Sequence, residues 1–218
     1  GDWQVNVQKL GGSLGSLVSR INGLGMKFGI WMEPEMVSED SSLYREHPDW
    51  AFAVPGRKPV RGRSQLVLDF SRKEVADYIF DSICRVLDSA HIEYLKWDMN
   101  RSIADVYSAA GKMAGGNSPG SILYRYMLYY TPQIWCSDNT DAVDRIRIQY
   151  GTSFGYPISA VGSHVSAVPN HQTGRITPMK TRGVVAMAGS FGYELNLSAI
   201  SEEDKNCVRE QIDAYHKY

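Results

Sequence analysis

The amino-acid sequence predicts an α/β fold with a parallel sheet, because segments of helical and strand-like periodicity alternate along the chain. An apolar stripe at helical spacing occupies residues 14–24 and ends at Gly25, and a strand-like stretch follows at 27–31. A second strand-like stretch at 66–70 precedes another helical stripe at 75–87. This alternation is typical of βα units.

The last third of the chain continues the pattern. A strand is expected at 156–161, a helix at 181–189 and a strand at 191–195. Ser201 and Asp204 form an acidic variant of the capping box, which predicts a final helix that runs toward the end of the sequence.

Length and charge set the limits on domain number and partners. With 218 residues the chain can bury one sizeable core, so a single domain over 1–218 is the simplest expectation. The 23 Lys and Arg against 24 Asp and Glu give a net charge of -1, and neither nucleic acid nor a membrane surface is expected to bind. The 13 Tyr and 5 Trp suit stacking on sugar faces, although most aromatic residues fill cores.

No metal, cofactor or disulfide is expected. Cys84, Cys136 and Cys207 are odd in number and far apart, which favours a reducing, cytoplasmic location. His164 and His171 could form a metal pair, but the sequence offers no third ligand at metal-site spacing, so hydrogen-bonded scaffolding is favoured. The sequence contains no P-loop, no dinucleotide fingerprint and no nucleophile elbow.

The stretch 94–101 is interpreted as a short strand that delivers Asp98 to a pocket. Lys96 lies two positions before Asp98, so both side chains point to the same face of a strand, and the cation favours an ionised carboxylate. An ionised carboxylate suits a nucleophile or a base. Spacing alone leaves a structural ion pair as an equal alternative.

A second apolar entry, Ile134 and Trp135, leads into a polar cluster at 136–141. The cluster could begin a helix, because Ser, Asp, Asn and Thr are preferred N-caps and Asp141 could occupy the first turn. It could also belong to a site at a strand end. Both interpretations can hold in a barrel of alternating strands and helices.

Five segments in this order carry a family resemblance: Phe28-Gly29-Ile30-Trp31-Met32-Glu33-Pro34-Glu35-Met36, Gly62-Arg63-Ser64-Gln65-Leu66-Val67-Leu68-Asp69-Phe70, Lys96-Trp97-Asp98-Met99-Asn100-Arg101, Trp135-Cys136-Ser137-Asp138-Asn139-Thr140-Asp141 and Gly162-Ser163-His164-Val165-Ser166-Ala167-Val168-Pro169-Asn170-His171-Gln172-Thr173. Together they resemble glycoside hydrolase family 36, the microbial α-galactosidases. The resemblance implies a (β/α)8 TIM-type barrel that hydrolyses terminal α-galactosides such as melibiose and raffinose without a cofactor.

The resemblance also implies a retaining mechanism, in which Asp98 is the nucleophile and Asp138 is the proton donor and acid/base. Such a mechanism needs two carboxyl groups about 5 Å apart, one ionised and one protonated. Lys96 favours the ionised form of Asp98, and burial by Ile134 and Trp135 could favour the protonated form of Asp138.

Substrate-binding residues are carried over from the same segments. Trp31 is expected to line the sugar pocket, and Arg63, Lys96, Trp97 and Asn100 to contact the galactose.

Two acids near these residues have no assigned chemistry. Glu33 and Glu35 flank a proline after the first strand, and they could be ligand groups or solvated loop charges with about equal weight.

The chain departs from the family pattern in several places. Residues 109–120 are small and turn-rich, as a flexible linker or lid would be. A family sugar-binding loop and the first barrel strand are missing, so about two strand-helix units are lacking, either because this is a fragment or because segments are omitted. Open sheet edges would then favour a homo-oligomer. The alternative function is a catalytically impaired sugar-binding fragment or a component of a larger assembly.

Overall fold

The computed structural model describes residues 2–100, 107–108 and 131–217, which belong to two compact units. Unit 1 is Gly1–Gly116 and unit 2 is Asn117–Tyr218, and each is described by itself. The linker or lid expected at 109–120 lies outside the described residues.

Unit 1 combines short strands with helices of different lengths. Its described elements, in chain order, are α1 (Val7–Leu10), α2 (Leu14–Asn22), β1 (Gly29–Met32), β2 (Met36–Ser38), α3 (Ser42–Glu46), the 3-10 helix η1 (Pro48–Trp50), β3 (Gln65–Val67), α4 (Lys73–Asp88) and β4 (Tyr94–Trp97).

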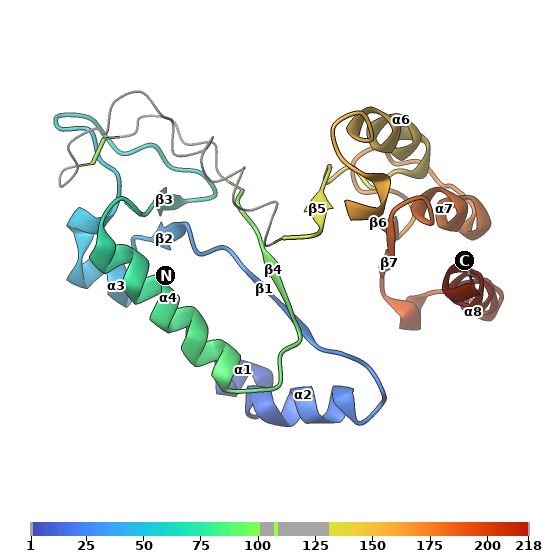
Figure 1. Cartoon of the computed structure of the whole chain (residues 1–218), viewed down its shortest axis with the longest axis horizontal. Helices are drawn as coiled ribbons and strands as arrows, with labels where there is room; N and C mark the ends of the chain where they lie inside the picture. Colours follow the sequence, from blue (N-terminus) through green and yellow to red (C-terminus); the bar gives the residue numbers. More distant parts are fainter. Residues whose placement is uncertain (1, 101–106, 109–130, 218) are drawn as a thin grey trace. The chain divides into compact units, whose positions relative to one another are not determined.

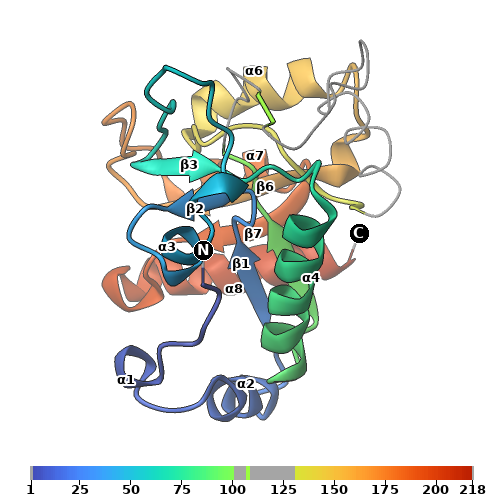
Figure 2. The same ribbon diagram turned by 90° about the vertical axis from the view of Figure 1, so that its left-hand side faces the viewer.

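The β1 and β4 strands form a parallel pair that positions Asp98. Gly29 lies opposite Tyr94 and Met32 opposite Trp97, and Figure 1 and Figure 2 show the two strands side by side. One residue beyond β4, the backbone N–H of Asp98 donates to the Met32 carbonyl at 2.8 Å. This bond fixes Asp98 at the carboxyl end of the pair.

The apolar stripes predicted at 14–24 and 75–87 form the buried faces of α2 and α4, except that α2 ends at Asn22 and leaves Leu24 exposed. Val18 in α2 and Val75 and Ile79 in α4 are almost fully buried, and they cluster with Met32 of β1. The spacing of these side chains brings them to one face of each helix, which is why the helices pack against the strands.

The β2 and β3 strands differ from the expectation of a purely parallel sheet, because they pair antiparallel, with Met36 opposite Val67. The strand expected at 66–70 begins one residue earlier and ends at Val67. Short apolar runs do not encode their pairing partner, so the sequence could not separate this ribbon from a βα unit.

Unit 2 is built on a parallel three-stranded sheet in the order β5-β6-β7. Its described elements are β5 (Ile134–Trp135), α6 (Ala142–Thr152), η2 (Ile158–Ala160), β6 (Val161–Ser166), α7 (Met179–Ala186), β7 (Ser190–Glu194), η3 (Leu197–Ala199) and α8 (Glu202–Lys217). Helices α6, α7 and α8 lie on one side of the sheet (Figure 1). The core between them contains Val165, Met179, Ala186 and Val208.

Of the elements expected for unit 2, one strand is wrong and the others are found. The helix expected at 181–189 is α7, which begins and ends earlier, and the strand expected at 191–195 is β7, shifted by one residue. The strand expected at 156–161 is the η2 turn, and β6 begins only at Val161, because the apolar residues after Pro157 fit either conformation. The final helix is capped as expected, since the Asp204 N–H donates to Ser201 Oγ at 3.1 Å.

Across the described parts of the chain, α4 and α8 are 16 residues long, and no described helix has the length and apolar character needed to cross a bilayer.

Candidate active site

The Asp98 carboxylate is held by donors from two neighbouring segments. Trp31 in β1 donates its indole N–H to Asp98 Oδ2 at 2.9 Å, and Asn100 Nδ2 donates to the same oxygen at 2.7 Å. The partner of Oδ1 among the described residues is the backbone N–H of Met99, at 3.1 Å. One oxygen of the carboxylate is therefore firmly oriented, while the other has the weaker partner.

The pKa of Asp98 lies below its ordinary value. Burial alone would raise this pKa, but the hydrogen bonds from Trp31 and Asn100 and the charge of Lys96 outweigh it. The net effect favours the ionised carboxylate, and Lys96 contributes as its position in the sequence suggested.

Asn100 connects Asp98 to the two acids of the loop after β1. Its Nδ2 donates to Glu33 Oε1 at 2.6 Å as well as to Asp98, and its backbone N–H donates to Glu35 Oε1 at 3.0 Å. Glu33 and Glu35 are only 8% and 7% exposed, so the alternative of solvated loop charges is wrong. Sequence reasoning left these two acids unassigned, although the dense Glu-Pro-Glu run beside Trp31 was a usable signal.

Arg63 reaches the same network from a tight turn. Its Nη1 lies 3.2 Å from Glu33 Oε1, which forms an ion pair. Arg63 and Ser64 have φ of 49° and 61°, and Gly62 and Gln65 exchange backbone hydrogen bonds across them. Two consecutive positive φ values are the signature of a type I′ turn, which normally uses Asn or Gly. The unfavourable backbone brings the guanidinium to Glu33.

Two of the residues predicted to bind sugar are indoles of the β1–β4 pair. Trp31 lies opposite Lys96 in the register, whereas Trp97 lies opposite Met32 of the buried core, on the other face of the pair. Trp31 is 46% exposed and Trp97 is 44% exposed, so both retain accessible ring surface. Aromatic faces of this kind are suited to stacking on a sugar ring.

Unit 1 also contains a hollow of about 460 Å³ beside β1. Trp31 lines it together with Ile30, Met32 and residues near the start of the chain, whereas Asp98 is not part of its lining. We therefore do not assign this hollow to the reacting sugar.

Asp138 lies three residues after Trp135 of β5, and its side chain is exposed on unit 2. The Trp135 indole N–H donates to Asp138 Oδ1 at 2.9 Å. The burial that the apolar entry was expected to provide is not found within unit 2, because Ile134 and Trp135 are themselves only half-buried.

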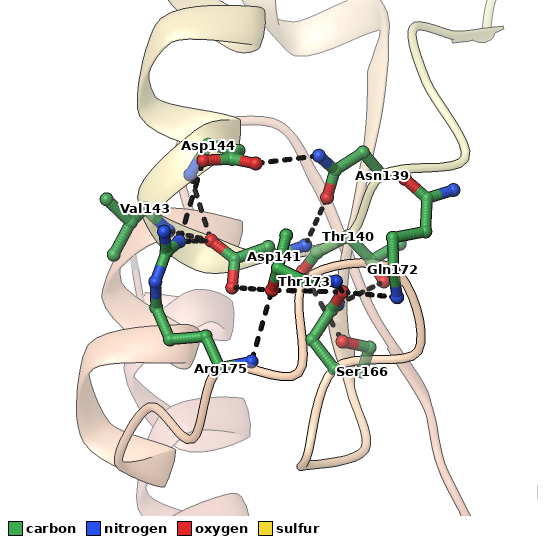
Figure 3. A network of polar contacts seen from close by, with 10 residues as sticks. Asn139, Thr140, Asp141, Val143, Asp144, Ser166, Gln172, Thr173 and Arg175 are labelled. Atoms are coloured by element: carbon green, nitrogen blue, oxygen red, sulfur yellow. Dashed lines mark hydrogen bonds and ion pairs between the residues drawn. The ribbon is translucent and has the colours of Figure 1, made fainter.

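The loop that carries Asp138 is fixed by Asp141, which is 2% exposed (Figure 3). Asp141 is the N-cap of α6: its Oδ1 accepts from the backbone N–H groups of Val143 and Asp144 at 3.0 and 3.1 Å. It also forms an ion pair with Arg175 and accepts from Thr173 Oγ1 at 3.0 Å. The helix start expected for this cluster is confirmed, with Asp141 as the N-cap of α6, and the site at the strand end stays a prediction.

The pKa of Asp141 lies below its ordinary value. Burial would raise it, but the backbone N–H of Asp144, the Thr173 hydroxyl, the charge of Arg175 and the N–H of Val143 together lower it. Asp141 is thus an ionised anchor between α6 and the loop after β6.

A buried arginine that sequence reasoning did not single out also holds the loop that carries Asp138. Arg145 in α6 donates to the Ser137 carbonyl at 3.1 Å and to the Gly162 carbonyl at 2.5 Å. It therefore ties the residue before Asp138 to β6. The signal in the sequence was weak, because a single Arg on an amphipathic helix is usually a surface residue.

A protein-family model matches the segments that carry all of these residues. A family model described as melibiase matches residues 1–127 and 112–218, two overlapping segments that include every residue of the chain. The chain belongs to the melibiase family. The resemblance to family 36 α-galactosidases drawn from the five sequence segments is thereby confirmed.

Relatives and solved structures of the melibiase family are similar over the full chain. A bifunctional α-galactosidase/sucrose kinase, AgaSK from Mediterraneibacter gnavus, is 59% identical over 242 residues, covering 100% of this chain and 26% of that protein. α-Galactosidase AgaA from Geobacillus stearothermophilus is 47% identical over 251 residues, covering 99% of this chain and 34% of that protein. A structure of AgaA in complex with raffinose matches with a TM-score of 0.92 and 47% identity over 99% of this chain and 34% of that one.

The coverage has two consequences. The chain spans between 26% and 34% of the length of these two relatives. The aligned length of 242 exceeds the 218 residues of this chain, so AgaSK carries positions in the matched region that this chain lacks. What the relatives act on is therefore transferred to this melibiase only as a proposal.

Proposed function

We propose that this melibiase chain is the catalytic part of a retaining α-galactosidase that acts on terminal α-galactosyl residues of melibiose- and raffinose-type oligosaccharides. The observation that carries the proposal is the ionised Asp98 at the end of β4, with Oδ2 held by Trp31 and Asn100. A carboxylate whose protonation state and orientation are both fixed is what a glycosidase nucleophile requires.

The reaction proceeds in two displacements. Asp98 Oδ1, which has the weaker hydrogen bond, attacks the anomeric carbon and forms a galactosyl ester, while Asp138 gives its proton to the leaving glycosidic oxygen. Asp138 then takes a proton from water, the water attacks the anomeric carbon, and Asp98 is released as a carboxylate. The two bond changes at the same carbon retain its configuration.

The hydroxyl-binding role of Asn100 follows from the one atom of its amide that the two carboxylates do not use. Both N–H groups of the Asn100 amide point to carboxylates, so its Oδ1 is the atom that accepts from a galactose hydroxyl. We assign Arg63 and Lys96 as donors to other ring hydroxyls, and Trp31, the register partner of Lys96, covers the apolar face of the sugar. Trp97 alternates to the other face of β4, so its predicted contact with the sugar is not part of this arrangement.

We also propose a (β/α)8 barrel as the complete fold, to which the parallel β1–β4 and β5–β6–β7 sets each contribute part. Barrel closure removes free strand edges, and a chain without the missing strand-helix units would cover them by association with a second copy. Light scattering of the purified chain tests this, and a strictly monomeric species at micromolar concentration would contradict the self-association.

Release of nitrophenol from nitrophenyl α-galactoside tests the activity, with Asp98→Ala as the matched control. We expect turnover by the chain and none by the variant. A fluorinated galactosyl donor that accumulates the ester should label the peptide containing Asp98. Equal rates for both proteins, or a label elsewhere, would contradict the proposal.

The second candidate, a catalytically impaired sugar-binding fragment or a component of a larger assembly, is favoured by one observation. The relative AgaSK has positions in the matched region that this chain lacks. Calorimetric binding of galactose without any turnover would select this candidate.

A further inference from the structure

The loop between β1 and β2 places two buried acids beside Asp98, and the proposed mechanism uses neither of them. Glu33 and Glu35 are joined to Asp98 through a single residue, Asn100. Three carboxylates in contact with one residue repel each other. All three can be ionised only if each has its own cation or hydrogen-bond donors.

The two glutamates differ in the donors and cations that could stabilise a negative charge. Glu33 Oε1 accepts from Asn100 Nδ2 at 2.6 Å and forms the 3.2 Å ion pair with Arg63. Within the described part of the chain, Glu35 Oε2 is sealed from solvent and has no hydrogen-bond partner. An ionised oxygen at that position would be an uncompensated buried charge.

We propose, building on the nucleophile role of Asp98, that these acids have opposite protonation states and distinct positioning roles. Glu33 is ionised, and through the shared Asn100 amide it sets the orientation of Asp98 and of Arg63. Glu35 is a protonated carboxyl group, with its proton on Oε2, that anchors the backbone of Asn100.

The geometry explains why both states are needed. The two N–H groups of one planar amide reach Glu33 at 2.6 Å and Asp98 at 2.7 Å, so the amide fixes the two carboxylates relative to each other. With Glu35 neutral, the anions Glu33 and Asp98 are balanced by Arg63 and Lys96. Burial first, and then the neighbouring charges of Glu33 and Asp98, raise the pKa of Glu35, which agrees with this assignment.

The matched test compares E33Q with E35Q. Each variant replaces one carboxyl oxygen by an amide nitrogen, and both positions lie in the same loop. The neutral amide introduced by E35Q mimics a protonated Glu35, so this variant should keep kcat within about 3-fold of the starting protein. E33Q should lower kcat by about 100-fold, the order expected when a reacting group is misplaced. The acid limb of kcat/KM should move to lower pH in E33Q alone, since Arg63 then lacks its counter-charge near Asp98.

Two spectroscopic measurements do not depend on turnover. They therefore test the protonation states of Glu33 and Glu35 even if the proposed galactosidase function fails. In the Asp138→Asn background, which removes the protonated general acid of the proposed mechanism, the infrared carbonyl band of a protonated carboxylic acid should be present at neutral pH with Glu35 intact or with E33Q added, and it should disappear when E35Q is added. The side-chain amide resonances of Asn100 should shift in E33Q and stay in place in E35Q. If the chain has no galactosidase activity, these spectra still decide the protonation states.

Several outcomes would overturn the assignment. They are a carbonyl band that, in the Asp138→Asn background, survives E35Q or is missing when Glu35 is intact, Asn100 amide resonances unchanged in E33Q, and equal losses of kcat in the two variants. Circular dichroism of both variants shows whether a loss of kcat reflects unfolding. If E33Q is unfolded, E33D, which keeps the charge at position 33, replaces it in the infrared measurement of the Glu35 protonation state.

Discussion

Asp98 and Asp138 each follow a parallel strand and each accept an indole N–H at 2.9 Å, yet the two sites are built differently. The indole of Asp98 comes from Trp31, 67 residues away, through the β1–β4 pairing, whereas Trp135 lies only 3 residues before Asp138. Asp98 is half-buried and held by a network that favours its ionised form, while Asp138 is exposed on its unit.

This difference suits the two proposed roles. A nucleophile must be ionised and oriented before the substrate arrives, so a long-range network is advantageous. A group that first gives and then takes a proton must accept both protonation states, and a rigid set of donors around it would favour only one. The rigidity in unit 2 lies in the Asp141 anchor rather than at Asp138 itself.

The largest effect should come from exchanging the aspartates one at a time. Asp98→Asn should lower kcat/KM by at least about 1000-fold on every α-galactoside, more than about 4 kcal/mol of transition-state stabilisation. Asp138→Asn should cost about 100- to 10,000-fold on raffinose and much less on nitrophenyl galactoside, whose leaving group needs little protonation. Steady-state kinetics on both substrates check this, and Asp81→Asn on the exposed face of α4 is the control. If Asp98→Asn and Asp138→Asn show the same ratio of kcat/KM losses on the two substrates, the two aspartates do not have the different roles proposed.

Removal of the Asp141 anchor should mainly affect stability. Asp141→Ala should lower the free energy of unfolding of unit 2 by about 3 kcal/mol, because it leaves buried donors without an acceptor and removes the N-cap of α6. Urea unfolding followed by hydrogen exchange in α6 measures the loss. Asp213→Ala, at an exposed position of α8, should change stability by less than about 0.5 kcal/mol, and an equal loss in both variants would argue against the anchor.

The two indole donors can be compared directly by conservative substitution. Trp31→Phe should lower kcat about tenfold, or about 1.4 kcal/mol, and move the acid limb of the pH profile upward, because Asp98 loses a donor that lowers its pKa. Trp135→Phe should reduce kcat less. A larger kcat loss for Trp135→Phe than for Trp31→Phe would contradict the view that long-range orientation matters more at Asp98.

The pH dependence of stability should have opposite sign for the two buried acids. Asp141 has a lowered pKa when folded, so its contribution is present above about 3.8 and is lost as pH falls through the folded value. Glu35 has a raised pKa, so its contribution is complete below about 4.5 and is lost as pH rises through the folded value. Subtracting the unfolding curves of Asp141→Asn and E35Q from that of the starting protein isolates each slope, and slopes of the same sign would refute the assignment.

The smallest effect concerns the turn that carries Arg63. Ser64→Gly should raise the free energy of unfolding by about 1 kcal/mol, because Gly adopts the positive φ at no steric cost. Ser64→Ala keeps the Cβ and should not stabilise. Thermal unfolding of both variants measures the difference, and a stabilisation by Ala equal to that by Gly would exclude backbone strain as its cause.

Sequence periodicity was sufficient for the α/β class and for the helices at α2 and α4. Apolar and aromatic residue types predicted the strand that delivers Asp98. The five segments were sufficient for the melibiase family. Local signals of this kind survive in the sequence because a 3.6-residue stripe or an N-cap depends on near neighbours only.

Pairing between distant segments decided the rest. The antiparallel β2–β3 ribbon, the burial of Glu33 and Glu35 and the donation from Trp31 to Asp98 depend on contacts between segments far apart in the chain. The positive φ of Arg63 and Ser64 was equally hidden, since neither residue favours it. A residue's type fixes which charges and hydrogen bonds it can offer, whereas the partners that set its protonation and orientation are chosen by tertiary packing.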